Sequence, residues 1–129
     1  MHIPHKALNL VIADDDSTTC RVLRLLLREL GHQVVAEAHD GEKAVELCDT
    51  HKPDIAFLDI DMPRMNGHQA AEKIRLNNPA VGMIMVSALP TAENVRAALQ
   101  AGASSFVVKP FNAVKVMDAI DDCLKHRRR

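Results

Sequence analysis

Short apolar runs alternate along the chain with longer segments in which apolar residues recur at helical spacing. The short runs span residues 8–13, 33–38, 55–59, 82–88 and 105–109. Several of them are rich in Val and Ile, and their length is typical of strands buried on both faces. The pattern therefore predicts five strands, each followed by a helix.

The segments with helical spacing span residues 17–30, 42–50, 67–77, 92–101 and 112–125. In the first of them, Val22, Leu26 and Leu30 share one face, which we expect to pack against the sheet. Ser17 is the expected N-cap of this helix, and Asp16 is expected to be an acid of the loop or first turn. The apolar positions of the other four helices are Val45, Cys48, Ala70, Ala71, Ile74, Val95, Ala98, Leu99, Val116, Met117, Ile120 and Leu124.

Alternation of strands and helices predicts a parallel sheet with helices on both faces. Five such units in 129 residues suit the α/β class and a doubly wound five-stranded parallel sheet of order 2-1-3-4-5. This is the flavodoxin-like (βα)5 arrangement. We expect a single domain over residues 7–126, with a tail at residues 1–6 and a basic tail at residues 127–129.

Polar side chains gather at the predicted carboxyl ends of four strands, where sheets of this kind bind ligands. These side chains are Asp14, Asp15, Asp59, Asp61, Ser87 and Lys109. Carboxylates are ligands for a hard divalent cation such as Mg²⁺, and an ammonium pairs with a phosphoryl oxygen or a carboxylate. Since a carboxylate can also act as a nucleophile, the set predicts metal-assisted phosphoryl transfer to an aspartate.

The composition restricts the classes of function. The formal net charge is −1 and the chain has no Trp or Tyr, so direct nucleic-acid binding is not expected. No apolar run reaches transmembrane length, and the first residues contain no long apolar segment of a signal peptide. We therefore expect a cytoplasmic protein without membrane association.

The cysteines and histidines do not show the spacing of a metal site. Cys20, Cys48 and Cys123 are far apart in the chain and form no CxxC pair, so reduced core thiols are expected rather than a zinc site or a disulfide. His39 and His68 are interpreted as surface residues near the strand ends.

The chain resembles the receiver domain of two-component response regulators from about residue 6 to residue 125. Four segments carry the resemblance in order: VIADDDS, DIAFLDIDMPRMNG, MIMVSA and AGASSFVVKPF. The resemblance implies a phosphoacceptor of a two-component system or phosphorelay, and not an enzyme. It also implies Mg²⁺ as the cofactor, with Mn²⁺ or Ca²⁺ as substitutes.

By the same resemblance, Asp59 is the phosphoacceptor. Asp14 and Asp15 are implied to bind the metal together with Asp59, and Asp61 is implied to contribute its main-chain carbonyl. Lys109 matches the lysine of these receivers that precedes a cis-proline.

Further roles follow from the resemblance alone. Ser87 and Phe106 match the two switch positions, and the peptide bond Lys109–Pro110 is expected to be cis. Asp61 and Leu89 match positions that tune the lifetime of the phosphoryl group. Because Leu89 cannot orient a water molecule, it is expected to slow self-dephosphorylation.

The implied phosphodonor is a sensor histidine kinase or a histidine phosphotransfer protein. An output domain or a target protein is expected at the face formed by the fourth helix, the fifth strand and the fifth helix, in a monomer or weak dimer. Two alternatives are a haloacid-dehalogenase-like Mg²⁺-dependent phosphatase, suggested by FLDIDMP, and a pseudo-receiver that takes no phosphate. The acid pair precedes the nucleophile, which argues against the phosphatase, and pseudo-receivers usually lack an acid or the lysine.

Overall fold

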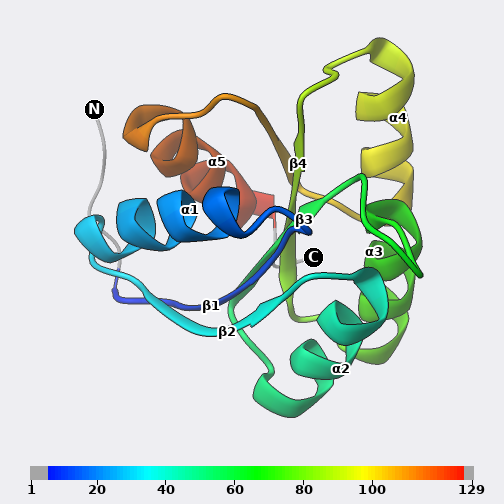
Figure 1. Ribbon diagram of the computed structural model, residues 1–129. Coiled ribbons are helices and arrows are strands. Elements are labelled where there is room, and N and C mark those ends of the chain that lie inside the picture. The colour runs from blue at the N-terminus through cyan, green and yellow to red at the C-terminus, as the bar shows by residue number, and fades with distance from the viewer. Residues whose placement is uncertain (1–5, 127–129) are drawn as a thin grey trace.

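A five-stranded sheet forms the centre of the computed structural model, which describes residues 6–126 (Figure 1). Its strands are β1 (Asn9–Ala13), β2 (Gln33–Ala38), β3 (Ile55–Asp59), β4 (Gly82–Ser87) and β5 (Ser105–Val108). All neighbouring strands are parallel, in the order β2-β1-β3-β4-β5. The predicted fold class and strand order are confirmed. The predicted tails lie outside the described residues except for Lys6.

Helices cover both faces of this sheet. They are α1 (Ser17–Glu29), α2 (Gly41–His51), α3 (Gly67–Asn77), α4 (Ala92–Ala101) and α5 (Ala113–His126). In Figure 1, α1 and α5 lie on one face, and α2, α3 and α4 lie on the other. Among the described residues, no helix combines the length and apolar character needed to cross a membrane.

Each face of the sheet carries its own apolar core. Every residue of β3 and β4 is buried, as expected for central strands covered by helices on both sides. Phe57 and Ile84 belong to the cluster that includes residues of α1 and α5, whereas Leu58 and Met85 belong to the cluster on the opposite face. The alternation follows from the two-residue period of a strand.

The predicted buried face of α1 is wrong. Its buried residues are Cys20, Leu23 and Leu27, whereas the side chain of Val22 is 43% exposed. Leu26 and Leu30 are only partly buried. Because α1 carries apolar residues at adjacent positions, more than one stripe has helical spacing, and contact with the sheet selects between them.

The predicted N-cap of α1 is also wrong. Asp16, and not Ser17, is the cap: its carboxylate accepts hydrogen bonds from the Thr18 N–H at 3.2 Å and the Thr19 hydroxyl at 2.7 Å. The hydrogen bond from Thr19, followed by that from Thr18, lowers the pKa of Asp16. Its carboxylate therefore stabilises the start of a helix.

The helix α4 is held by small side chains. Its buried residues are Ala98 and Ala101, and the side chain of Leu99, predicted to face the sheet, is 57% exposed. The helix ends at Gly102, which adopts φ +109° and supplies the left-handed C-cap. Little apolar surface therefore fixes α4 to the rest of the fold.

Candidate functional site

Three carboxylates meet at the carboxyl ends of the neighbouring strands β1 and β3. Ala13 of β1 pairs with Leu58 of β3, so Asp14 and Asp59, the next residue on each chain segment, lie side by side. One carboxylate oxygen from each of Asp14, Asp15 and Asp59 lies within 4.8 Å of the other two. Asp14 and Asp59 are buried, whereas Asp15 is exposed.

Lys109 brings an ammonium group to these carboxylates from the end of β5. Its Nζ lies 2.8 Å from Asp14 Oδ2 and 3.4 Å from Asp59 Oδ1. Its main-chain N–H donates to the Ser87 carbonyl at 2.8 Å, and its peptide bond to Pro110 is cis. Burial alone would lower the pKa of the Lys109 ammonium, but the hydrogen bond to Asp14 and the charge of Asp59 raise it overall.

The electrostatics of Asp59 show that the site holds more negative charge than Lys109 neutralises. Burial, followed by repulsion from Asp14, raises the pKa of the Asp59 carboxyl from its ordinary 3.8 to about 6, although Lys109 opposes the shift. A set of three carboxylates with a deficit of positive charge suits a divalent cation with oxygen ligands. The residues present therefore fit Mg²⁺.

The hydroxyl of Ser87 is held by the loop between β4 and α4. It accepts a hydrogen bond from the Leu89 N–H at 3.0 Å and lies 3.4 Å from the Leu89 carbonyl oxygen. The same carbonyl accepts from Asn94 Nδ2 of α4 at 2.8 Å. The Leu89 side chain is 60% exposed. Asn94, which the sequence pattern did not single out, therefore links α4 to the loop that holds Ser87.

The β3–α3 loop packs closely against the end of β3. A Cβ atom on Gly67 would overlap the main-chain carbonyl of Asp59, so α3 can begin here only with glycine. Gly67 N–H donates to the Ile60 carbonyl at 2.9 Å. Asp61 lies between these residues with an exposed side chain. The role of its main-chain carbonyl as a metal ligand stays a prediction.

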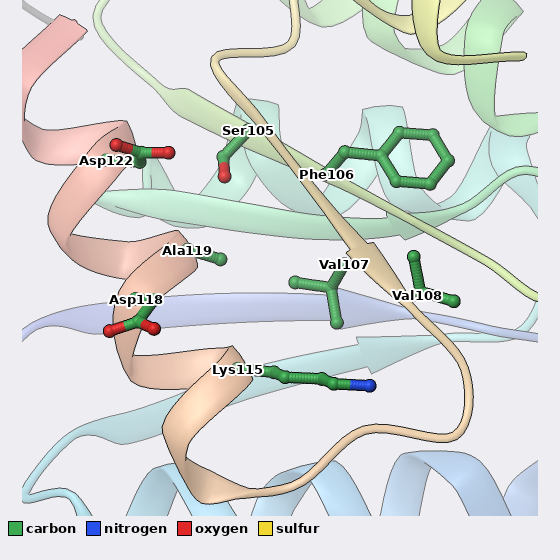
Figure 2. A pocket seen from close by; sticks show the side chains of 8 residues that line it. All are labelled: Ser105, Phe106, Val107, Val108, Lys115, Asp118, Ala119 and Asp122. Atoms are coloured by element: carbon green, nitrogen blue, oxygen red, sulfur yellow. The ribbon is translucent and has the colours of Figure 1, made fainter. Parts of the chain in front are cut away.

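Phe106, the predicted aromatic switch residue, lies on β5. Figure 2 shows its ring projecting away from α5, whose Lys115, Asp118 and Asp122 line a pocket beside the strand. The ring is partly buried and packs against the core cluster on the α2–α4 side of the sheet. Its movement on phosphorylation stays a prediction.

A second group of three potential metal ligands occurs among the described residues, and sequence spacing did not predict it. It consists of Cys20 from α1, Glu37 from β2 and His39 from the loop after β2. The pairing of β2 with β1 and the packing of α1 against β2 bring these residues together. Cys20, Cys48 and Cys123 are buried and form no disulfide, as predicted.

Comparisons with known proteins agree with this geometry. The sequence model of the response regulator receiver domain family matches residues 10–121. Chemotaxis protein CheY of Listeria monocytogenes is 38% identical over 118 residues, which cover 92% of this chain and 99% of that protein. CheY of Bacillus subtilis is 39% identical over 115 residues, covering 89% of this chain and 96% of that protein.

A solved structure is similar as well. The crystal structure of the CheX–CheY–BeF3–Mg²⁺ complex from Borrelia burgdorferi contains a chain with a TM-score of 0.84 and 34% sequence identity. The match covers 87% of this chain and 85% of that chain. The similarity therefore extends over nearly all of the fold.

Proposed function

The chain belongs to the response regulator receiver domain family, and on this premise we propose that it accepts a phosphoryl group from a phosphohistidine onto Asp59. The observation that carries the proposal is the position of Asp59: its buried carboxylate lies beside Asp14, Asp15 and the ammonium of Lys109. The phosphodonor would be a sensor histidine kinase or a histidine phosphotransfer protein.

The proposed transfer uses a carboxylate oxygen of Asp59 as the nucleophile. The oxygen forms a bond to phosphorus while the bond between phosphorus and the donor histidine nitrogen breaks, and the electron pair of that bond returns to the imidazole. Asp14, Asp15 and Asp59 would hold Mg²⁺, or Mn²⁺ or Ca²⁺ in its place, with the Asp61 carbonyl. When bound, the ion supplies positive charge that offsets the charge of the transferring group.

Lys109 and Ser87 would then position the phosphoryl oxygens. Lys109 Nζ is already within 3.4 Å of Asp59 Oδ1, so a short movement would bring it to a phosphoryl oxygen on that atom. For Ser87 to donate to another, its O–H must turn away from the Leu89 carbonyl oxygen. That change would release a loop bonded to α4 through Asn94 and would bias a two-state equilibrium.

We infer that Phe106 follows this change and alters the face formed by α4, β5 and α5, where an output domain or target protein would bind. The partly buried position of the ring on β5, beside the pocket of Figure 2, supports this role. The same face could pair with a second copy in a weak dimer.

The proposal is tested by incubating the full chain with acetyl phosphate and Mg²⁺ and measuring its intact mass. A receiver should gain one phosphoryl group per chain and then lose it slowly to water. A phosphatase related to haloacid dehalogenases would instead hydrolyse a phosphomonoester repeatedly, and a pseudo-receiver would gain no mass. Either of the last two results would overturn the proposal.

The two neighbouring acids Asp15 and Asp16 should differ in their effect on metal binding. Asp15→Ala removes one of the three converging carboxylates, so we expect a large loss of Mg²⁺ affinity. Asp16→Ala removes the cap of α1 and should lower thermal stability while barely changing that affinity. Isothermal titration calorimetry with Mg²⁺ measures the difference, and equal losses in both variants would contradict the assignment.

Replacing Leu89 should shorten the lifetime of the phosphoryl group. The main-chain N–H of Leu89 donates to the Ser87 hydroxyl, and its apolar side chain is exposed and cannot orient an attacking water molecule. In Leu89→Gln, an amide at this position can hydrogen-bond a water, so we expect faster decay. Loss of the phosphoryl mass over time measures both rates. The same decay rate in the two proteins would show that Leu89 has no such role.

A further inference from the structure

Cys20, Glu37 and His39 form a compact set of ligand atoms beneath the β1–α1 loop. We propose that they bind one Zn²⁺ ion, at a site separate from the carboxylates of the phosphorylation cleft. A thiol sulfur, a carboxylate oxygen and an imidazole nitrogen from the three residues lie within 4.8 Å of one another. Zinc sites are built from these three ligand types.

The hydrogen bonding of His39 leaves one ring nitrogen facing a carboxylate. Nδ1 lies 3.0 Å from the main-chain carbonyl oxygen of Asp14, and because a carbonyl can only accept, Nδ1 must carry a proton. Nε2 lies 3.2 Å from Glu37 Oε2. With the proton on Nδ1, Nε2 and the carboxylate oxygen are both acceptors, and a cation between them would satisfy the pair.

The separation of these two atoms suits a shared metal ion. Two ligands about 2.1 Å from a tetrahedral zinc ion are about 3.4 Å apart, close to the 3.2 Å between Nε2 and Oε2. Histidine ligands commonly donate their other ring N–H to a carbonyl or carboxylate, which fixes the orientation of the ring. The Asp14 carbonyl already serves His39 in this way.

The other carboxylate oxygen of Glu37, Oε1, accepts a hydrogen bond, as is common in carboxylates that bind metals. Arg24 donates to Glu37 Oε1 at 2.7 Å, which fixes the carboxylate with Oε2 on the side of His39. Hydrogen bonds of this kind to carboxylate ligands are a regular feature of metal sites.

Cys20 supplies the soft ligand that distinguishes this set from the aspartates. Its thiol is buried and lies 3.4 Å from the Asp14 carbonyl oxygen. Burial, followed by the charges of Glu37 and Asp14, raises the pKa of the free thiol to about 12. On binding, the sulfur–zinc bond forms as the thiol proton leaves to solvent, and the two positive charges of the ion offset the thiolate and carboxylate.

Solvent can reach the site, and one coordination position stays open. The side chain of His39 is 52% exposed, so an ion can approach past the imidazole. Three protein ligands leave the fourth tetrahedral position to water. Both His39 and Cys20 contact the main-chain carbonyl of Asp14. An ion bound here would therefore be linked through Asp14 to the phosphorylation cleft.

The experiment titrates the full chain with Co²⁺ in the presence of excess Mg²⁺, which occupies the aspartates. Binding at Cys20 should produce a thiolate-to-cobalt charge-transfer absorption that saturates at one ion per chain and disappears when Zn²⁺ is added. The absorption should be absent in Cys20→Ser and unchanged in Cys48→Ser. His39→Gln should weaken Zn²⁺ binding by more than the 10–100-fold typical of an outer-shell mutation, and His51→Gln should not.

Several results would overturn the site. The wild type could show no charge-transfer absorption, or the same absorption could persist in Cys20→Ser. Equal Zn²⁺ affinity in His39→Gln and His51→Gln would exclude His39 as a ligand. Because both histidines are exposed, these two variants decide the question even if Cys20→Ser does not fold, which circular dichroism would reveal. None of these readouts depends on phosphorylation of Asp59.

Discussion

The Asp59→Asn variant is expected to gain no phosphoryl group at this position from acetyl phosphate and Mg²⁺, where the wild type gains one. An amide oxygen or nitrogen is a far weaker nucleophile than a carboxylate. The substitution also removes one of the three carboxylates that converge on the metal position. Intact-mass measurement, followed by peptide mapping of borohydride-reduced wild type, gives both the stoichiometry and the modified residue.

The matched control is Asp61→Asn, which changes an acid two residues further along with an exposed side chain. Its main-chain carbonyl is retained, so labelling should persist, although its rate or lifetime can change. Labelling of Asp59→Asn to the extent of the wild type would show that another residue accepts the phosphoryl group. Loss of labelling in both variants would point to a general disturbance of the β3–α3 loop.

The Asp59→Asn substitution should also stabilise the metal-free protein at neutral pH. The pKa of Asp59 is raised from 3.8 to about 6 in the folded protein, so the folded state binds this proton more tightly than the unfolded chain does. The resulting stability is fully present below about pH 4 and is lost as the pH rises through about 6. A rise in the pKa from 3.8 to about 6 corresponds to roughly 3 kcal/mol of stability. Above pH 6 we therefore expect the free energy of unfolding of Asp59→Asn to exceed that of the wild type by up to this amount.

Urea unfolding in the presence of a chelator measures this difference at about pH 4 and about pH 7.5. The gap between variant and wild type should be small at the lower pH and large at the higher one. Adding Mg²⁺ should then stabilise the wild type more than the variant, because ligand binding to the folded state adds to its stability. A gap that is independent of pH would show that ionisation of Asp59 does not cause it.

The strand order and the convergence of Asp14, Asp59 and Lys109 could be predicted because both follow from local patterns. A buried parallel strand is a short, continuous apolar run, and the residue at its carboxyl end enters the cleft whatever the details of packing. The structure places the Lys109 ammonium 2.8 Å from Asp14 Oδ2, which agrees with the predicted convergence.

The orientation of α1 could not be predicted in this way. Val22, Leu23, Leu26 and Leu27 form two overlapping apolar stripes, and helical periodicity alone gives both the same support. The contact with the sheet buries Leu23 and Leu27 and leaves Val22 exposed. The cap was ambiguous for a similar reason, since Asp16 and Ser17 are adjacent and both residue types are good N-caps.

The group of Cys20, Glu37 and His39 was missed because it depends on contacts between elements. Cys20 lies on α1, and the other two residues lie at the end of β2, which is placed at the edge of the sheet by its pairing with β1. Motif spacing detects ligands on one helix or hairpin, so a set assembled by a crossover connection gives no local signal. The strand register between Ile12 and Glu37 is the information that the sequence lacks.

The weak attachment of α4 has a consequence for local unfolding. Ala98 and Ala101 are its buried side chains, and burying a methyl-sized group contributes only about 0.8 kcal/mol. Segments with so little buried apolar surface open well below the free energy of global unfolding, and their amide hydrogens exchange early. Asn94 connects this helix to the loop that holds Ser87. A small change in binding energy at that loop can therefore shift or unfold α4 while the sheet stays intact.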